Sequence, residues 1–208
     1  MEIEAKLIVS DPQVFATLEG MGSIGPFGLA VRPGVERQGN TYLDTADGRL
    51  QALRYGLRIR DLGDRRIGTL KGERQEHGGI TERLEIEAEV GDAFQPRDWP
   101  EGELRQRTLE LLGDTPVAPL LSIQTDRRYI DALLDGRPFA EICLDEGTIS
   151  AGDRVESFRE LEVELTDRAQ RDAFEQLVQL VRERFALPVG HQSKLERGLR
   201  LLKQGTGN

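Results

Sequence analysis

At least five segments of this chain place charged residues on one strand face, and four of them alternate charged with hydrophobic residues. The first nine residues place Glu2, Glu4 and Lys6 at every second position, with hydrophobic residues between them. A period of two is typical of a β-strand with one charged and one hydrophobic face. One such segment is a weak signal, because many half-buried strands alternate in this way. The pattern recurs, however, in residues 55–60, 83–90 and 160–165, and in 66–71 Thr69 and Lys71 share one face.

The remaining elements follow from turn signals and helical spacing. Further strands are expected over 36–44, 122–134 and 139–144, with Asp135-Gly136 as a hairpin turn and Asp145-Glu146-Gly147 as a strand end. Helices are expected over 11–22, 104–113 and 168–185, with a short helical turn in 47–54 and a last helix starting at Ser193. Residues 23–35 and 72–79 predict loops. Neither a repeat nor a linker is evident, so we expect one domain over 1–204 and a flexible tail over 205–208.

The charged strand faces allow two interpretations. They could point to water, above a core made by the hydrophobic faces. Alternatively, the sheet could close on itself with the charges inside, because the amphipathic segments 11–22, 104–113 and 169–185 could cover a hydrophobic outer face. A barrel of about eight strands holds side chains or one small ligand.

A charged interior would need a ligand that neutralises both kinds of charge. Packed carboxylates require cations to stay ionised, and clustered Arg and Lys require an anion. Oxygen ligands select hard ions such as Mg²⁺ or Mn²⁺, and Arg binds phosphate oxygens in pairs. The charged faces therefore favour a polyanion bound with divalent metal.

Composition excludes several classes of protein. The 208 residues carry a net charge of −9, which argues against nucleic-acid binding. The chain has one cysteine and two histidines, so internal disulfides and a His/Cys zinc site are not expected. Acidic residues from position 2 exclude a signal peptide, and no hydrophobic run reaches transmembrane length. We expect a cytoplasmic protein without a membrane partner.

Nine ordered motifs resemble one family. The opening Glu2-x-Glu4-x-Lys6 looks like the signature of the CYTH superfamily, the triphosphate tunnel metalloenzymes. The motifs that follow it in the family's order are Tyr42-x-Asp44-Thr45, Leu57-Arg58-Ile59-Arg60, Thr69-x-Lys71, Arg83-x-Glu85, Arg127, Asp145-x-Gly147, Glu160-Leu-Glu162-Val-Glu164 and Ser193-Lys194-x-x-Arg197-Gly198. The chain is most similar to the bacterial inorganic triphosphatase branch, in which such a domain often precedes a helical CHAD domain. The Gly-rich end fits a native chain that continues into one.

The resemblance implies an α+β fold, with an eight-stranded antiparallel β-barrel forming a charged tunnel and amphipathic helices packed outside. The phosphate-binding residues would be Lys6, Arg58, Arg60, Lys71, Arg83, Arg127 and Lys194. The metal ligands, direct or through water, would be Glu2, Glu4, Asp145, Glu162 and Glu164. Catalysis would rest on Glu2, Glu4, Lys6 and Glu85, and Glu87 would complete the acidic side.

Several assignments stay open at the sequence level. Alternation does not decide whether Arg127 or Arg128 faces inward, and the choice of Arg127 rests on the resemblance. Glu160 is expected near the tunnel mouth. Simple alternatives are that Asp145 only forms a turn, that Lys194 and Arg197 are solvated helix residues, and that 42–45 is only a strand end.

The predicted activity is metal-dependent hydrolysis of inorganic triphosphate to pyrophosphate and phosphate. Within the same fold, the alternatives are a thiamine triphosphatase, which needs a hydrophobic or aromatic mouth, and a nucleoside triphosphatase or adenylyl cyclase, which needs a base pocket. An alternative of another class is a module that binds polyphosphate without cleaving it.

Overall fold

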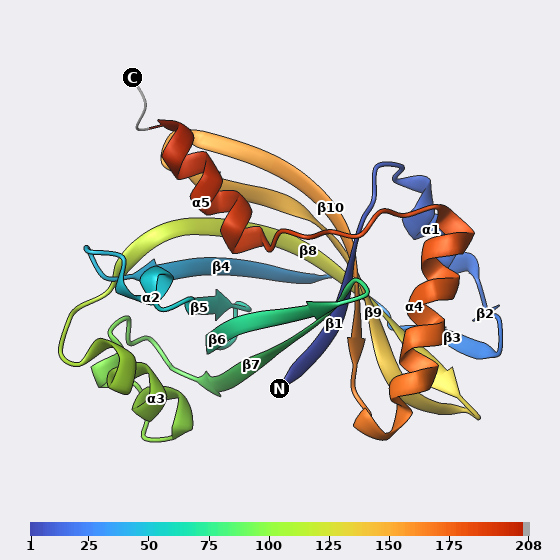
Figure 1. The fold of residues 1–208 in the computed structure, drawn as a ribbon, viewed down its shortest axis with the longest axis horizontal. Coiled ribbons are helices and arrows are strands. Elements are labelled where there is room, and N and C mark those ends of the chain that lie inside the picture. Colours follow the sequence, from blue (N-terminus) through green and yellow to red (C-terminus); the bar gives the residue numbers. More distant parts are fainter. Residues whose placement is uncertain (206–208) are drawn as a thin grey trace.

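One continuous antiparallel sheet dominates the computed structural model, which describes residues 1–205 (Figure 1). Its strands are β1 Glu2–Ile8, β2 Ser23–Ile24, β3 Phe27–Val31, β4 Glu36–Asp44, β5 Gly56–Asp61, β6 Arg66–His77, β7 Ile80–Glu89, β8 Ala118–Leu134, β9 Arg137–Ala151 and β10 Arg154–Leu165. Its helices are α1 Gln13–Gly20, α2 Arg49–Ala52, α3 Glu103–Leu112, α4 Arg171–Phe185 and α5 Lys194–Gly205, with 3₁₀ turns at Pro96–Asp98 and Arg168–Gln170.

Eight of the strands close into a ring. The order β8-β4-β5-β6-β7-β1-β10-β9 returns to its start because β9 also pairs with β8. The small pair β2-β3 extends the far half of β8, where Val31 pairs with Ile130. The predicted eight-stranded antiparallel tunnel with helices outside it is confirmed.

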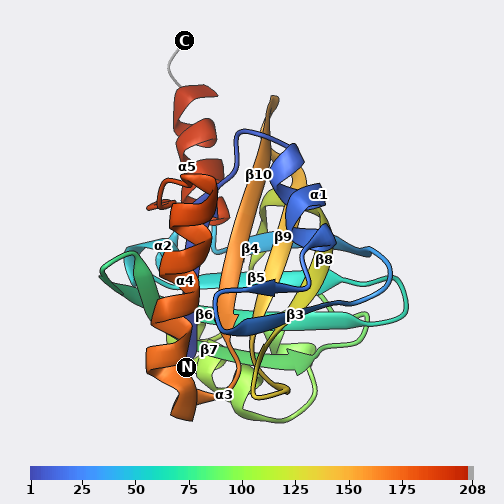
Figure 2. The same ribbon diagram turned by 90° about the vertical axis from the view of Figure 1, so that its right-hand side faces the viewer.

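Alternation along each strand assigns its side chains to the inside or outside of the ring. On β1, Lys6 faces its partner Glu162 inside, whereas Ala5 and Leu7 point outward and are fully buried. The largest outer core covers these residues with α1 and α4, including Leu177 of α4. Figure 2 shows α4 beside β10 and α1 near the upper end of β9. The hydrophobic faces are therefore buried beneath helices, and the charged faces turn inward.

A second outer core lies beneath α3. It joins Leu57 of β5 and Leu70 of β6 to Leu104 of α3 and to Trp99, whose indole nitrogen donates to the carbonyl of Ala93 at 3.0 Å. Burial of these side chains stabilises the wall of the ring that carries the arginines of β5.

Helix α5 packs against one end of the tunnel. Leu121, Ile123 and Phe158 lie in the same hydrophobic core as Leu201 of α5. Leu121 and Ile123 share the inward face of β8 with Arg127, because they alternate with it. The interior is therefore charged in its middle and hydrophobic beneath α5.

Three loop or strand-end predictions are wrong. Residues 23–35 contain β2 and β3, in which buried Phe27 and Leu29 alternate around Gly28. Strand β6 continues to His77 through an irregularity in its pairing with β7, although its last residues are polar. Strand β9 passes through 145–147 to Ala151 instead of ending there.

Gly147 explains why the strand end expected at 145–147 is wrong. A Cβ at this position would lie 1.9 Å from the carbonyl oxygen of Gln124 and 2.9 Å from Phe158. Gly147 therefore permits close strand contact rather than a turn. Asp145, two residues earlier, lies in mid-strand.

The C-terminal boundary also shifts. Gly205, predicted as the start of the tail, is the last residue of α5, and residues 206–208 lie outside the described part of the chain. No helix within residues 1–205 is both long and hydrophobic enough to cross a membrane.

Candidate active site

The ring encloses a cavity of about 120 Å³ lined almost entirely by polar and charged side chains. All thirteen predicted site residues line it: Glu2, Glu4, Lys6, Arg58, Arg60, Lys71, Arg83, Glu85, Arg127, Asp145, Glu162, Glu164 and Lys194. Glu87 lines it as well, whereas Glu160, expected near the tunnel mouth, is fully buried and does not line the cavity.

Carboxylates gather on one wall. Glu2 and Glu4 project from β1, and Glu164 projects from β10 opposite Glu4. One oxygen from each of the three lies within 4.8 Å of the others. An all-oxygen set of this kind fits a hard divalent ion such as Mg²⁺ or Mn²⁺.

Cations from β6 and β7 hold the same carboxylates in place. Lys71 Nζ lies 3.0 Å from Glu2 and 2.9 Å from Glu85. Arg83 pairs with Glu2 through Nε and donates to Glu4 from Nη2 at 3.0 Å. These residues are adjacent because Arg83 is the cross-strand partner of Glu2, and Glu85 that of Lys71.

These neighbours separate the pKa values of the carboxyl groups. Burial and the charges of Glu162, Glu4 and Glu2 raise the pKa of Glu164 to about 7, although Arg127 opposes this. Burial also raises the pKa of Glu85, and the charge of Glu2 adds to this effect. Burial acts in the same direction on Glu2, but Lys71 and Arg83 outweigh it and hold the pKa of Glu2 well below its usual range. A divalent ion placed here would therefore displace a proton from Glu164 near neutral pH.

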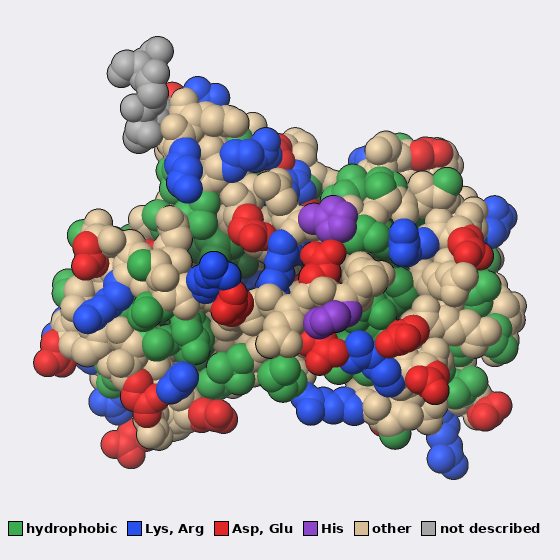
Figure 3. All heavy atoms as spheres, in the orientation of Figure 1, with side chains coloured by type: hydrophobic (Ala, Val, Ile, Leu, Met, Phe, Trp, Pro, Cys, Tyr) green, Lys and Arg blue, Asp and Glu red, His purple; other side chains and the backbone are tan. Residues whose placement is uncertain are grey.

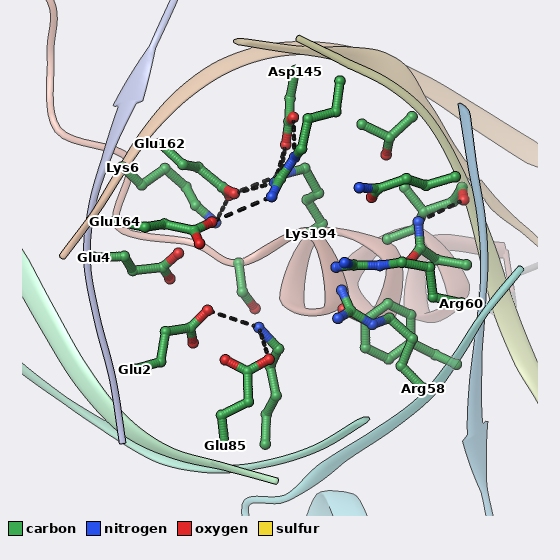
Figure 4. A pocket seen from close by; sticks show the side chains of 18 of the residues that line it. Glu2, Glu4, Lys6, Arg58, Arg60, Glu85, Asp145, Glu162, Glu164 and Lys194 are labelled. Atoms are coloured by element: carbon green, nitrogen blue, oxygen red, sulfur yellow. Dashed lines mark hydrogen bonds and ion pairs between the residues drawn. The ribbon is translucent and has the colours of Figure 1, made fainter. Parts of the chain in front are cut away.

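Two arginines of β5 face this acidic wall from across the tunnel (Figure 4). Arg58 donates from Nη2 to Thr69 at 3.1 Å and to Glu87 at 3.4 Å, and its buried Nε has no hydrogen-bond partner among the described residues. Arg60 donates to the neutral side chain of Asn40 at 3.2 Å. Burial lowers the pKa of Arg60, and repulsion from Arg58 and Arg127 lowers it further. This concentration of incompletely neutralised positive charge fits a phosphate group.

A third cluster surrounds Asp145. Arg127 donates to both of its oxygens at 2.7 Å and to Glu162 at 2.6 Å. Lys194 of α5 lies 2.9 Å from Asp145 and 2.8 Å from Glu162. Asp145 is completely buried, and its pKa is lowered because Lys194 and Arg127 outweigh the effect of burial. Its role as a metal ligand stays a prediction, since both oxygens already accept from cations.

The structure resolves the choice left open on β8. Arg127 points into the tunnel, whereas Arg128 points outward and donates to Glu19 of α1 at 2.9 Å. Asp145 is fully buried, the Lys194 side chain is only 13% exposed, and both line the cavity, so the solvated-helix and simple-turn alternatives are wrong for these two residues.

Sequence reasoning missed several neutral residues of the wall. Gln38, Asn40 and Tyr42 of β4 and Thr125 of β8 line the cavity. Period-two alternation along 36–44 would have placed the three β4 residues on one face. Burial would raise the pKa of Tyr42, but Arg58, Lys71 and other cations outweigh it, so this pKa lies below its ordinary value.

Comparison with known proteins shows the family and the fold to which this chain is similar. The profile of the CYTH domain matches residues 1–198. A protein from Hippeastrum, named as an adenylyl cyclase with a dominant triphosphatase activity, superposes with a TM-score of 0.69 at 20% identity and covers 99% of this chain and 96% of its own. A protein from Bacillus halodurans named as an adenylate cyclase gives 0.64 at 22% identity, with 95% and 96% covered.

A further protein, PH1819 from Pyrococcus horikoshii, gives a TM-score of 0.62 at 20% identity and covers 97% of this chain and 99% of its own. At these identities the likeness concerns the fold alone. The profile match, however, extends over nearly the whole chain and includes the Glu2-x-Glu4-x-Lys6 signature. The chain therefore belongs to the CYTH family.

Proposed function

We propose that this protein hydrolyses a phosphoanhydride bond of inorganic triphosphate, with Mg²⁺ or Mn²⁺, to give pyrophosphate and phosphate. The observation that carries the proposal is the polarity of the tunnel. Glu2, Glu4 and Glu164 converge on one wall. Arg58 and Arg60 face them; Arg60 donates to the neutral side chain of Asn40, and Arg58 pairs with Glu87 at 3.4 Å while its Nε has no hydrogen-bond partner among the described residues. A triphosphate together with divalent metal complements both walls at once.

Different residues of the tunnel would bind the phosphates, hold the metal and accept the proton. Arg58 and Arg60 hold the phosphate oxygens, and the carboxylates of β1 and β10 would hold the metal. When bound, a divalent ion neutralises phosphate charge and lowers the pKa of a coordinated water. Glu85, with its raised pKa, would accept a proton from the attacking water. Phosphoryl transfer depends mainly on positioning and charge neutralisation, which such a tunnel can supply.

A covalent intermediate on the cysteine is not part of the proposal. Cys143 faces the tunnel, and its Sγ lies 3.7 Å from Glu164. Burial raises the pKa of this thiol well above its ordinary value, and Glu164 adds to the effect despite opposition from Arg127. Because the thiolate is the nucleophilic form, direct attack by water is the simpler mechanism.

Phosphate release tests the proposal. Purified protein with triphosphate and Mg²⁺ or Mn²⁺ should release phosphate and pyrophosphate in equal amounts, and EDTA should stop the reaction. Binding of triphosphate without release would instead support the non-hydrolytic polyphosphate-binding module. A protein that neither binds nor cleaves triphosphate would contradict the tunnel site itself.

A second pocket supports an organic triphosphate as the alternative substrate. It has a volume of about 400 Å³, and its lining includes Tyr55, Leu195 and Leu199. It shares Tyr42, Lys71, Arg83 and Ser193 with the charged cavity. In Figure 3, hydrophobic side chains are visible in the hollow beneath α5. Such a pocket could hold an aromatic head group while the phosphates enter the tunnel.

Substrate comparison separates the two candidates. For an inorganic triphosphatase, kcat/KM for triphosphate should exceed the values for ATP and thiamine triphosphate, and Tyr55→Ala should leave all three unchanged. For an organic triphosphatase the order should reverse, and Tyr55→Ala should lower kcat/KM only for the substrates with a head group. Release of pyrophosphate from ATP together with cyclic AMP, and without phosphate, would identify a cyclase.

A further inference from the structure

Glu160 is a buried carboxylate that does not line the cavity. It is the first of the three in-phase glutamates of β10, and none of its surface is exposed. Its Oε1 accepts from Arg197 at 2.6 Å, and its Oε2 lies 2.9 Å from Lys194 Nζ and 3.7 Å from Lys6 Nζ. Both carboxylate oxygens therefore contact positively charged groups, so Glu160 acts as a counter-ion to Arg197 and the two lysines.

Arg197 joins this carboxylate to the outer part of β10. It lies three residues after Lys194 in α5, so the two side chains share one face of the helix. Its Nε donates to Glu156 at 2.7 Å, while its Nη1 donates to Glu160. Arg197 thus attaches α5 to two carboxylates on one face of the same strand.

Lys194 and Arg197 both lie over one aromatic ring, that of Phe158. The ring centroid of Phe158 is 5.1 Å from Lys194 Nζ and 5.7 Å from the guanidinium carbon of Arg197. Gly198 lets the helix approach closely, because a Cβ there would lie 2.5 Å from Leu121. The helix therefore has a defined depth and rotation relative to β10.

The two lysines need this fixed counter-ion. Lys6 and Lys194 both lie against Glu162, at 3.1 and 2.8 Å, and they repel each other. Glu162 borders the cavity and would be drawn toward metal, whereas Glu160 is inaccessible from it. When ligands fill the tunnel, Glu160 would keep its charge on both lysines, in addition to the pairing of Asp145 with Lys194 at 2.9 Å.

We infer that Arg197 is a positioning residue, which acts through Glu160 to hold the Lys194 ammonium group in the tunnel wall. The consequence for triphosphate binding rests on the proposed function, but the placement of Lys194 does not. Arg200 of the same helix offers a matched control, because it pairs with Glu156 at 2.7 Å and not with Glu160.

Chemical labelling tests the placement without any substrate. The chain has only four lysines, and exposed Lys203 serves as the internal reference for Lys194. Acetylation by acetic anhydride, followed by mass spectrometry, should label Lys194 slowly relative to Lys203. Arg197→Gln should raise this ratio at least about fivefold, Arg197→Lys should restore most of the protection, and Arg200→Gln should change the ratio less than twofold. Equal ratios in Arg197→Gln and Arg200→Gln would overturn the inference.

Calorimetry of triphosphate with Mg²⁺ tests the consequence. Arg197→Gln should weaken binding about tenfold in the wild-type background but less than twofold in Lys194→Ala, because it acts through that lysine. An unchanged effect in Lys194→Ala would show a merely structural role. If Arg197→Gln does not fold, Glu160→Gln should give the same two results. A wild-type protein that binds no triphosphate would contradict the proposed function, while the labelling still decides the role of Arg197.

Discussion

Arg58 and Arg60 differ from the other tunnel cations in their partners. Lys6, Lys71 and Arg83 each form close ion pairs with carboxylates, whereas Arg60 meets a neutral amide and the Nε of Arg58 is unpaired among the described residues. Their positive charge is therefore the most available for an anion. The carboxylates of Glu2, Glu4 and Glu164 on the opposite wall lie close together, so a bound cation would neutralise their charge.

Removal of Arg58 should weaken substrate binding more than chemistry. Arg58→Ala should raise the KM for triphosphate about 10- to 100-fold, because a hydrogen bond to a charged group contributes about 1.5–3 kcal/mol, and kcat should fall less. Steady-state kinetics with saturating Mg²⁺ measures both. Arg66 at the start of β6 serves as the control, because its Nη1 donates to the Asp92 carbonyl at 3.2 Å outside the cavity. Arg66→Ala should leave both kcat and KM unchanged. A lower kcat with unchanged KM would assign Arg58 to the transition state alone.

Removal of Glu4 should abolish turnover through loss of metal. Glu4 is 5% exposed and lies in the oxygen cluster with Glu2 and Glu164. In Glu4→Ala, kcat should fall at least about 100-fold, and titration calorimetry should show weaker Mn²⁺ binding. Glu89→Ala removes an exposed carboxylate of β7 that does not line the cavity and serves as control. Wild-type turnover of Glu4→Ala at saturating metal would remove Glu4 from the metal site.

The raised pKa of Glu164 gives the metal-free protein an unusual pH dependence. Between its ordinary value of 4.5 and about 7, folded Glu164 binds a proton that the unfolded chain releases. Stability should therefore fall as pH rises through this window, by up to about 3 kcal/mol. That value is an upper bound, because 27% of the side chain remains exposed.

Urea unfolding in EDTA at pH 5 and pH 7.5 measures this effect. Glu164→Gln, which cannot titrate, should lose most of the difference and keep only the smaller contribution of Glu85, whose pKa is also raised. Saturating Mg²⁺ should reduce the slope in the wild type. Stability that rises with pH over this interval would show that Glu164 is already ionised in the empty tunnel.

At the scale of elements, β9 shows why local signals misplace boundaries. Asp145-Glu146-Gly147 has the composition of a turn, yet all three residues pair with both β8 and β10. Gly147 is required by the neighbouring strand, not by its own backbone. A single sequence carries no record of such a contact, because Gln124 is distant along the chain.

Gly147→Ala should therefore destabilise the sheet strongly. The new Cβ would meet a backbone oxygen, which cannot move without disturbing β8. We expect a loss of about 3 kcal/mol or more in the free energy of unfolding, at the upper end for overpacked sites. Gly22→Ala, where no atom lies within 4 Å, should change stability by less than about 1 kcal/mol. Similar denaturation midpoints for the two variants would show that β8 and β9 tolerate wider spacing.

The last helix was predicted correctly for a local reason. Ser193 Oγ accepts from the amide of Glu196 at 3.2 Å, and Glu196 accepts from the amide of Ser193 at 2.7 Å. This capping box is visible in the sequence as Ser-x-x-Glu. The insertion of Lys194 between Asp145 and Glu162 is not visible there, because it depends on where the helix docks.

At the scale of the whole molecule, the tunnel concentrates charges that repel one another within each wall. Ligands that neutralise both walls should therefore stabilise the fold. Triphosphate with Mg²⁺ at 100 times its dissociation constant should add about 2.7 kcal/mol by mass action. Differential scanning fluorimetry should show a higher Tm with both ligands than with either one alone. A Tm that neither triphosphate nor Mg²⁺ changes, alone or together, would contradict a site inside the ring.

The sequence by itself determined which residues share each strand face, the order of the motifs and the charge that one face carries. Alternation follows from backbone geometry, so Glu2, Glu4 and Lys6 had to share one face of β1 in any fold. Only the tertiary structure decided that this face turns inward, that α5 packs over one end, and that Glu160 pairs with Lys194 and Lys6. Those outcomes depend on ring closure and helix docking, which bring together residues far apart in the chain.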